Sequence, residues 1–393
     1  MKTLIELYDE RPLENVLSTE VFRPEKTVFI CARNVADDKK LKKKLRTYMS
    51  HRGVDTELVF TRAGMYSAPD IIKVLKEVIQ ENKDCALDVS GGTDDALFAA
   101  GLVSGETQLP VFTYSRRKNT FYNIMNAPFA KDLPCTIQYS VEDSILMAGG
   151  ALRVGRVDNA VLSDYLDKFD PFFNLYMKNR REWTKIVEYI QQLSRPGKDE
   201  TEPSLQVKGS YSQKGTRGVI IPAPEKALRE YEKIGFISNL KISREEGVSF
   251  TFADQWTRTW MRDIGSVLEL YTYKKCIEAG TFYDVVTSAV VDWEGDNAAD
   301  AVTNEIDVMT TCGVNPIFIS CKTCDVKTEA LNELAILRDR FGSGMSKAAI
   351  VTTRNGGAAM RRRALELGIE VIDAKDITSG KMVALLKKLS GIS

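Results

Sequence analysis

The sequence predicts an α/β protein with two α/β domains and a connector of different composition between them. Three observations support this. Strand-like and helix-like segments alternate over residues 27–114, residues 194–217 are rich in Pro, Gly, Ser and charge, and a second alternating unit covers residues 260–373. Such alternation is typical of sheets covered by helices. We therefore expect domains at residues 1–155 and 259–393, joined by a connector at residues 156–258.

In the first domain, we expect an acidic lead-in and then alternating strands and helices. Buried apolar runs predict strands, and amphipathic runs predict helices. The expected strands are 27–32, 54–60, 85–89 and 109–114, and the expected helices are 37–52, 69–81 and 93–103. This order favours a parallel, doubly wound, Rossmann-like sheet, in which ligands bind beyond the carboxyl ends of the strands.

A glycine turn follows the third expected strand and leads directly into a helix. It contains Gly91 and Gly92, between Ser90 and Thr93. Unpaired backbone N–H groups and the positive end of the helix dipole favour phosphate at such a turn. A plain strand–turn–helix connection capped by Thr93 is the competing interpretation.

The connector combines a helical part with a short winged-helix-like part. Residues 159–193 are helical and aromatic, which is typical of interdomain or dimer core. Residues 194–217 predict a mobile segment, because Pro, Gly, Ser and charge dominate them. A helix at 225–237 and a hairpin at 240–252 follow. The tip of this hairpin, Ser243-Arg244-Glu245-Glu246, is too acidic for a nucleic-acid wing, which favours a structural role.

The last domain is expected to contain a helix, three strands and a helix–strand–helix–strand tail. The expected elements are helices 263–279, 328–341 and 356–367 and strands 282–293, 304–308, 317–322, 347–353 and 370–373. Gly313 and Asn315 supply turn chemistry between two of the strands, which predicts an antiparallel pair.

That antiparallel pair places acids beside a lysine. Alternation puts Glu305 and Asp307 on one face of the first strand, and Ser320 and Lys322 of the second strand can lie beside them. Carboxylates are the hard ligands that Mg²⁺ or Mn²⁺ prefer, and a lysine can stabilise developing charge on phosphate. A surface salt bridge is the competing interpretation. Glu269, on the preceding helix, can reach the same metal or serve as an ordinary exposed acid.

Composition narrows the function classes. The 54 basic and 54 acidic residues cancel, so net charge neither supports nor excludes nucleic acid. Seven scattered cysteines favour a reducing compartment over a disulfide framework, and one histidine argues against Ser-His or Cys-His catalysis. The absence of a long apolar run or a signal-like start predicts a cytoplasmic protein without membrane contact.

The order of these motifs resembles a known family. Glu269, then Glu305-Ile306-Asp307, then Ser320-Cys321-Lys322 resembles the PD-(D/E)xK fold of restriction-type nucleases, and the run from Ser90 to Ala100 looks like CARF domains, which sense cyclic oligoadenylates. A CARF domain, a winged-helix-like connector and a PD-(D/E)xK domain are together similar to the dimeric ancillary nucleases of type III CRISPR systems of the Can and Card type.

The resemblance implies roles for the C-terminal residues. Asp307 matches the metal-binding aspartate, Lys322 the catalytic lysine and Glu269 the helix acid, while Glu305 matches an additional acid that binds metal or orients water. These four are the expected catalytic residues.

One position departs from the nuclease pattern. Ser320 stands where the pattern has Asp or Glu, so the backbone carbonyl of Cys321, or a water, is implied as the remaining ligand. The implied cofactor is Mn²⁺ or Mg²⁺, held by Glu269, Asp307 and Cys321.

The resemblance also implies a ligand for the first domain. Ser90, Gly91, Gly92 and Thr93 match the phosphate- and ribose-binding turn, although Asp94 replaces a lysine often found next. Arg33 and Asn34, after the first expected strand, are further candidates. Cyclic tetra-adenylate is the expected activator, bound on the two-fold axis of a homodimer.

The expected function is therefore a cyclic-oligoadenylate-activated, metal-dependent nuclease that cleaves RNA or DNA. Two alternatives are left open. The first domain could bind an ordinary nucleotide, or the protein could be a ligand-responsive transcription regulator with an inactive nuclease-like domain.

Overall fold

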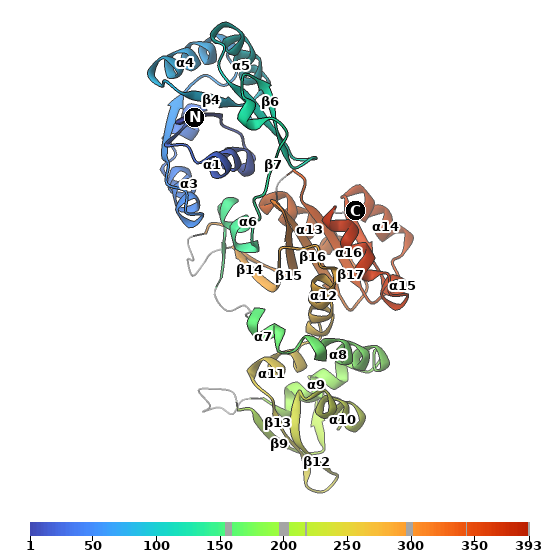
Figure 1. The fold of residues 1–393 in the computed structure, drawn as a ribbon. Helices are drawn as coiled ribbons and strands as arrows, with labels where there is room; N and C mark the ends of the chain where they lie inside the picture. Colours follow the sequence, from blue (N-terminus) through green and yellow to red (C-terminus); the bar gives the residue numbers. More distant parts are fainter. Residues whose placement is uncertain (154–158, 196–203, 217, 296–301, 343, 392–393) are drawn as a thin grey trace.

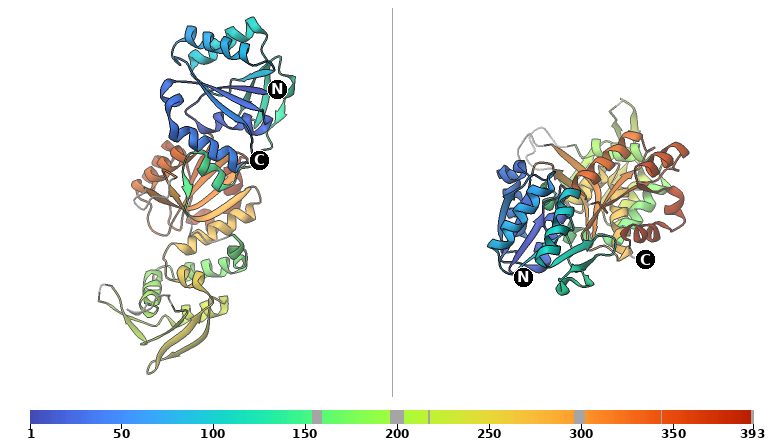
Figure 2. Two further views of the ribbon diagram at one scale, coloured as in Figure 1. Left: turned by 90° about the vertical axis from the view of Figure 1, so that its left-hand side faces the viewer. Right: turned by 90° about the horizontal axis from the view of Figure 1, so that it is seen from above.

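The computed structural model describes residues 1–153, 159–195, 204–216, 218–295, 302–342 and 344–391. The molecule is elongated, with three units stacked along one direction (Figures 1 and 2). The C-terminal domain, although last in the sequence, lies between the first domain and the connector. The chain therefore passes the C-terminal domain on its way to the connector and then returns to form it.

The first domain is built on a seven-stranded sheet, parallel across its first five strands, in the order β3-β2-β1-β4-β5-β6-β7. The strands are β1 (Thr3–Leu7), β2 (Lys26–Cys31), β3 (Glu57–Arg62), β4 (Cys85–Asp88), β5 (Val111–Ser115), β6 (Thr120–Met125) and β7 (Leu133–Pro134). The last two pair antiparallel. The predicted parallel sheet is thus confirmed.

Helices cover both faces of this sheet. One face carries α4 (Ala68–Glu81) and α5 (Asp94–Thr107), whose apolar residues share a core with β1, β2 and β4. The other face carries α1 (Leu17–Phe22) and α3 (Lys39–His51), which share a second core. Short helices α2 (Arg33–Asp37), η1 (Pro12–Asn15) and η2 (Pro128–Ala130) complete the domain. This arrangement is doubly wound, as predicted.

The predicted acidic lead-in is wrong, because it contains β1, an inner strand of the sheet between β2 and β4. All five residues of β1 are buried, including Glu6. Burial, with Asp88 nearby, raises the pKa of Glu6 well above its usual value, so this acid can be neutral in the core. A glutamate in a short apolar run concealed a central strand.

The boundary predicted at residue 155 also differs from the structure. Helix α6 (Val141–Met147) packs in the core of the C-terminal domain, and β8 (Ala151–Leu152) pairs with the edge strand of its sheet. The interface continues through one backbone bond, from Tyr139 N to Gly313 O at 3.0 Å, and one side-chain bond, from Lys44 Nζ to Gly149 O at 2.7 Å. Residues 141–152 therefore belong structurally to the C-terminal domain.

The connector contains helices and two small sheets. Its helices are α7 (Asn159–Ser163), α8 (Leu166–Lys178), α9 (Trp183–Leu193), α10 (Glu225–Ile234) and α11 (Gln255–Met261). Its strands are β9 (Gln206–Gly209), β10 (Ser212–Lys214), β11 (Ile220–Pro222), β12 (Ile237–Ser243) and β13 (Gly247–Phe252), in the orders β12-β13-β9 and β10-β11. The predicted helix–hairpin part corresponds to α10, β12 and β13.

The segment predicted to be mobile contains two of these strands. β9 adds to the β12–β13 hairpin and buries Val207, and β10 pairs with β11. The alternating Gln-Val-Lys-Gly run of β9 thus pairs with β13, a strand distant in sequence that composition did not indicate. Residues 196–203 and 217 of that segment lie outside the described residues.

The C-terminal domain has a mixed six-stranded sheet in the order β18-β17-β16-β15-β14-β8. Its elements are α12 (Ser266–Ala279), β14 (Asp284–Asp292), β15 (Thr303–Cys312), β16 (Asn315–Lys322), α13 (Thr328–Phe341), β17 (Lys347–Thr352), α14 (Ala358–Glu366), β18 (Ile369–Ile372), α15 (Ala374–Thr378) and α16 (Met382–Ser390). Strands β15 and β16 pair antiparallel, as predicted, β14 also pairs antiparallel with β15, and β16, β17 and β18 are parallel.

One continuous core joins the connector to the C-terminal domain. Apolar residues of α8, α9 and α10 belong to the same cluster as those of α12 and α16. The opposite face of the sheet packs on α13 and α6 through a separate cluster. Among the described residues no helix combines the length and apolar character of a membrane span.

Candidate active site

Asp307 is the centre of the candidate site. It lies on β15 at the edge where β16 ends, because the two strands pair antiparallel through Val308 and Ile319. Its Oδ2 atom accepts three hydrogen bonds, from Ser320 Oγ at 3.0 Å, from the backbone N of Cys321 at 2.6 Å and from Lys322 Nζ at 3.1 Å. The structure therefore brings the predicted aspartate and lysine into contact.

The contact with Asp307 also affects the protonation of Lys322. Although burial opposes the charged ammonium, the Asp307 carboxylate raises the pKa of Lys322 above its usual range. The lysine is thus a fixed cation at neutral pH. It suits stabilisation of negative charge on phosphate better than proton abstraction.

Glu269 faces Asp307 from the first turn of α12, which packs on β14, β15 and β16. Burial is the main cause that raises the pKa of Glu269 to about 8, and the carboxylates of Asp307, Asp263 and Glu305 add to it. Glu305 responds in the same direction, as burial and Asp307 raise the pKa of its carboxyl. The predicted acids are therefore close enough to repel one another.

This donor set fits a hard divalent cation. The carboxylates of Glu269, Glu305 and Asp307 repel one another although Lys322 pairs with Asp307, and a divalent cation there would relieve that repulsion. Among the described residues, however, no three His, Cys, Asp or Glu side chains converge as a ready-made metal cluster. The match to a metal thus rests on the chemistry of the oxygens, since the ligands are not pre-assembled.

Cys321 contributes backbone and not sulfur. Its N–H is one of the donors to Asp307, while its buried thiol lies 3.4 Å from Thr272 Oγ1. Burial, Asp307 and Glu269 raise the pKa of this thiol well above its usual value. A neutral thiol is a poor metal ligand, so the predicted involvement of Cys321 is left to its carbonyl oxygen.

Ser288 is a site residue that the sequence did not reveal. It lies in β14 with φ of 51°, a left-handed conformation inside a strand, and its hydroxyl donates to Glu269 Oε2 at 3.3 Å. The same hydroxyl lowers the pKa of Glu305 and thus reaches both acids. The Thr-Ser-Ala-Val run is typical of a regular strand, so it gave no signal.

Asp263 is a second such residue. Its Oδ2 accepts from the backbone N of Gly265 at 2.8 Å and of Ser266 at 2.6 Å, at the start of α12. An Asp three residues before Ser266 is a recognisable helix-start signal. What the sequence did not indicate is that this cap lies beside Glu269 and Glu305.

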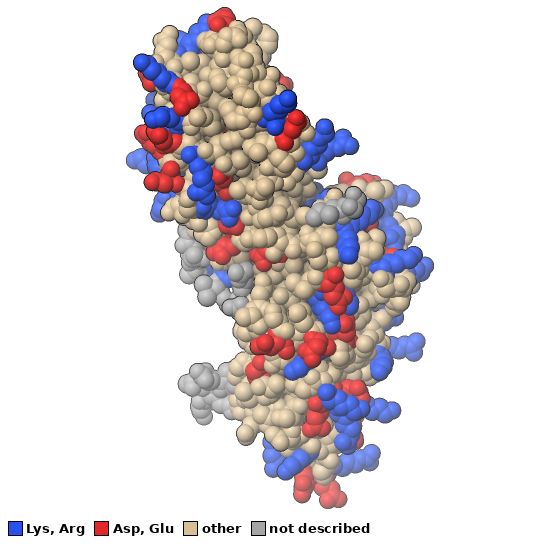
Figure 3. Space-filling model, viewed as in Figure 1, with Lys and Arg blue, Asp and Glu red and all other residues tan. Residues whose placement is uncertain are grey.

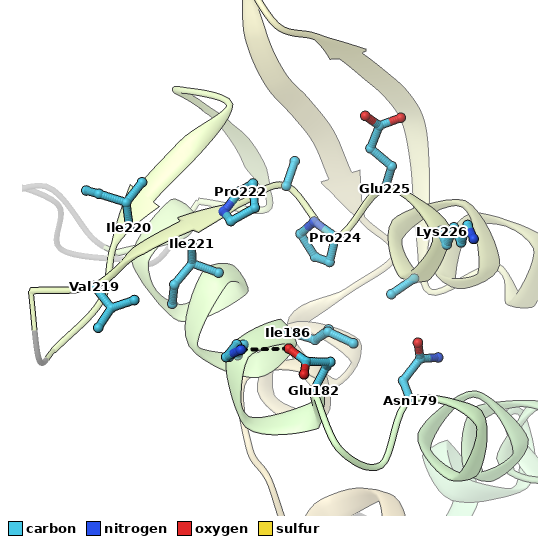
Figure 4. Close-up of a pocket in the computed structure, with 13 residues that line it drawn as sticks. Asn179, Glu182, Ile186, Val219, Ile220, Ile221, Pro222, Pro224, Glu225 and Lys226 are labelled. Atoms are coloured by element: carbon cyan, nitrogen blue, oxygen red, sulfur yellow. Dashed lines mark hydrogen bonds and ion pairs between the residues drawn. The ribbon is translucent and has the colours of Figure 1, made fainter.

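A small cavity adjoins these residues. It has a volume of about 130 Å³, and Glu305, Asp307, Ser320 and Lys322 line it together with residues of α13. A second cavity, of about 620 Å³, lies in the connector between the start of α9 and the β11–α10 stretch (Figure 4). Figure 4 shows aliphatic and proline side chains along that cavity. None of the site acids lines it.

The glycine turn of the first domain is ordered by its neighbours. Ser90 N donates to Asp88 Oδ1 at 2.7 Å, and Thr93 Oγ1 accepts from Ala96 N at 3.3 Å, which caps α5. Gly92 has φ of 102°, and a Cβ there would come within 2.8 Å of the side chain of Leu7, so a larger residue does not fit.

An internal carboxylate occupies the donor of this turn. Gly92 N donates to Asp9 Oδ2 at 3.0 Å, and Asp9 is also paired with Arg11 at 2.8 Å. Asp9 follows β1, the strand between β2 and β4. Because the sequence did not identify β1, it gave no indication that Asp9 would reach the glycine turn.

The other predicted sensor residues are less closely associated. Arg33 and Asn34 begin α2 after β2, at the same sheet edge as the turn but beyond β1. Both are exposed, and Arg33 pairs with Asp37 at 3.5 Å. Within the described residues no hydrogen bond joins them to the turn, so their part in ligand binding is still a prediction.

Comparison with known proteins agrees with this architecture. Residues 258–388 match the family model described as "Card1-like, endonuclease domain". The structure of protein VC1899 from Vibrio cholerae superposes with a TM-score of 0.75 at 18% identity, covering 99% of this chain and 98% of that one. Can2 from Sulfobacillus thermosulfidooxidans, solved with cyclic tetra-adenylate, has a TM-score of 0.70 at 15% identity, covering 98% and 99%. No curated protein matches the sequence.

Proposed function

Because residues 258–388 form a Card1-like endonuclease domain in a chain with the fold of Can2, we propose that the protein is a cyclic-oligoadenylate-activated, metal-dependent nuclease of type III CRISPR defence. The observation that carries this proposal is the convergence of Ser320, Cys321 and Lys322 on Asp307, with Glu269 opposite. Its cysteines are free thiols, in keeping with action in the cytoplasm.

The site residues divide the work of phosphodiester hydrolysis. Asp307, Glu269 and the carbonyl of Cys321 would hold Mn²⁺ or Mg²⁺, with Glu305 as a further ligand or as the residue that orients water. The bound metal supplies Lewis-acid charge and an activated water. Lys322, fixed beside Asp307, stabilises the charge that develops on the phosphate.

Ser320 replaces a carboxylate with a neutral donor. Its hydroxyl donates to Asp307 Oδ2, the atom that also accepts from Cys321 N and Lys322. Three donors on one oxygen orient the carboxylate and leave the other oxygen for a cation. Position 320 therefore lacks the negative charge that the general pattern has there, which favours weaker metal binding at this position.

The first domain is the proposed sensor. The glycine turn at the start of α5 supplies backbone donors suited to phosphate, and Can2 was solved with cyclic tetra-adenylate. We take cyclic tetra-adenylate as the activator, bound at Ser90, Gly91, Gly92 and Thr93, with Arg33 and Asn34 as further contacts.

A homodimer is the proposed assembly. The outer face of α5 exposes Phe98 (63%), Leu102 (46%) and Leu97 (38%), an unusual concentration of large apolar residues on one helix. Gly101 and Gly105 have open space beside them on that helix, so a second helix could approach closely. Pairing of two copies through α5 would bring two glycine turns toward one symmetric ring.

The deciding experiment combines purified protein with each cyclic oligoadenylate in turn, Mn²⁺ or Mg²⁺, and labelled RNA, single-stranded DNA and duplex DNA. Metal-dependent cleavage that requires one ring supports the proposal, and Asp307→Ala should abolish cleavage while ring binding persists. Ring binding without cleavage under any condition would favour a regulator with an inactive nuclease-like domain, and activation by an ordinary nucleotide would reassign the sensor.

A further inference from the structure

We propose that four exposed arginines where the connector meets the C-terminal domain guide the backbone of a nucleic-acid strand to Asp307 and Lys322. Arg180 and Arg181 lie in the turn between α8 and α9, Arg354 follows β17, and Arg362 lies on α14. We call these four residues the arginine track. The inference rests on the proposed nuclease function and adds a substrate surface to it.

The connector touches the strand end next to the catalytic lysine. Arg180 Nη1 donates to Thr353 O at 3.0 Å, and the hydroxyls of Tyr176 and Thr353 lie 2.6 Å apart. Thr353 N in turn donates to Lys322 O at 3.3 Å. Two hydrogen bonds therefore separate Arg180 from the backbone of Lys322.

The start of α9 contacts the segment that precedes the helix carrying Glu269. Trp183 Nε1, at the start of α9, donates to Ile264 O at 3.3 Å, just before α12 begins. Trp183 is almost fully buried, so this contact is part of the shared core. The α8–α9 turn and the start of α9 are thus held by Thr353, which is bonded to the backbone of Lys322, and by the segment before α12.

Arg354 and Arg362 lie at the same edge for a topological reason. Strands β16 and β17 are parallel, with Lys322 in register with Thr352, so the residues after β17 lie beside the end of β16. Helix α14 starts a few residues later. Figure 3 shows Lys and Arg side chains along the side of the molecule that carries α14 and the end of α8 in Figure 1.

Among the described residues the track arginines have no acidic partner. All four are exposed, and no ion pair involves them within the part of the chain that the structure describes. The neighbouring Arg361 is different, because it pairs with Asp373. A polyanion that approaches crowded carboxylates must be attracted by cations elsewhere, and guanidinium groups whose charge no carboxylate neutralises suit phosphate well.

The connector carries its relevant positive charge on the α8–α9 turn and not on its hairpin. Its hairpin tip carries Glu245 and Glu246, which argued for a purely structural role, whereas its α8–α9 turn carries Arg180 and Arg181. Arg180 in the turn contacts Thr353, which is bonded to the backbone of Lys322, and the described residues show no such contact for the hairpin tip. The connector thus contributes half of the substrate surface.

The test measures binding without cleavage. In full-length protein with Asp307→Ala, the arginines are replaced as Arg180→Gln, Arg181→Gln, Arg354→Gln and Arg362→Gln. Binding of a labelled single strand, with its activating ring present, is followed by fluorescence anisotropy at several salt concentrations. The matched control replaces four exposed cations elsewhere, Lys39, Lys43 and Arg46 on α3 and Lys387 on α16, by Gln.

Each phosphate contact contributes about 0.7 to the slope of log affinity against log salt for single strands. The track variant should therefore lose roughly 2 to 3 from that slope and bind roughly ten- to a hundred-fold more weakly near 0.1 M salt, whereas the control should change little. Unchanged binding by the track variant, or an equal loss in the control, would overturn the track. A polyglutamate competitor that displaces the strand at equal charge would assign the surface to acidic proteins instead.

The outcome is separable from the proposed function. If protein with Asp307 intact fails to cleave any nucleic acid, the nuclease proposal fails even when the track binds the strand. If it cleaves, and the track variant in the same background cleaves long strands equally well at limiting substrate, the track fails alone. Thermal unfolding of both variants confirms that the substitutions leave the fold intact.

Discussion

Ser288 lies opposite Asp307 across β14 and β15, between the register pairs Thr287–Val308 and Ala289–Ile306. Glycine adopts the left-handed backbone conformation of Ser288 more readily than serine does, so this conformation does not itself require a side chain. A strained residue at this point indicates a role for the hydroxyl that reaches Glu269.

The first prediction uses this strain to separate function from stability. Ser288→Gly should leave the protein as stable or up to about 1 kcal/mol more stable, because the left-handed strain is removed. Loss of a hydrogen bond to a carboxylate should nevertheless weaken Mn²⁺ binding and cleavage by roughly ten-fold. Calorimetry with Mn²⁺ and thermal unfolding measure the two effects. Ser288→Ala, which keeps the strain, should show the same functional loss at lower stability, and full function in Ser288→Gly would contradict this role.

The second prediction concerns Lys322. Lys322→Met keeps an apolar stem of similar length and removes the ammonium beside Asp307. Cleavage should fall by about 10²- to 10³-fold, as expected for loss of a charge-stabilising donor. Binding of cyclic tetra-adenylate should be unchanged, since the glycine turn lies in another domain. Parallel single-turnover cleavage and ring-binding assays check this, and a loss of both would contradict the separation of sensor and catalytic roles.

The third prediction is a pH dependence of stability without metal. The pKa of Glu269 is raised from 4.5 to about 8, so its proton is held more tightly in the folded state than in the unfolded chain. The resulting stabilisation is fully present below pH 4.5 and is lost as the pH rises through about 8. In EDTA the melting temperature of the protein should therefore fall between pH 5 and pH 9.

Glu269→Gln is the control for this effect. It mimics the neutral acid, so its melting temperature should exceed that of the unaltered protein at pH 9 and converge with it at pH 5. The difference between the two proteins isolates Glu269 from other titrating groups. Parallel pH curves for the two proteins would argue against a shared, repulsive acid cluster.

The fourth prediction concerns the carboxylate on the glycine turn. Asp9 already accepts the N–H of Gly92, and its charge repels an incoming phosphate. Asp9→Asn keeps an acceptor for Gly92 and removes the charge, so the affinity for cyclic tetra-adenylate should rise by about ten-fold, or 1.4 kcal/mol. Calorimetry with the ring measures it. Weaker binding by Asp9→Asn would show that Asp9 helps to hold the ring.

Sequence patterns predicted those parts of the fold that depend on local periodicity. The alternation from residue 27 onward gave the parallel sheet, and the two-residue period placed Glu305, Asp307 and Lys322 at one edge. The pairing of β15 with β16 followed from the short turn between these neighbours in sequence.

Features that depend on distant partners could not be predicted in this way. β1 was concealed because its Glu6 is an acidic residue, a type that is usually exposed, and yet it is buried. β8 has only two residues, and its partner β14 begins more than 130 residues later. Asp9 reaches the glycine turn, and Ser288 reaches Glu269, through contacts that no local pattern encodes.

The contacts between the first domain and the C-terminal domain limit how a signal can travel within one chain. Tyr139 N donates to Gly313 O, Arg52 pairs with Asp143 of α6 at 2.9 Å, and Arg116, beside the sensor edge, lies 3.1 Å from the point where a side chain at Gly344 would begin. A hinge at this junction would have to break these contacts. We therefore expect a bound ring to act by rotating each chain as a rigid body relative to the other chain of the proposed homodimer.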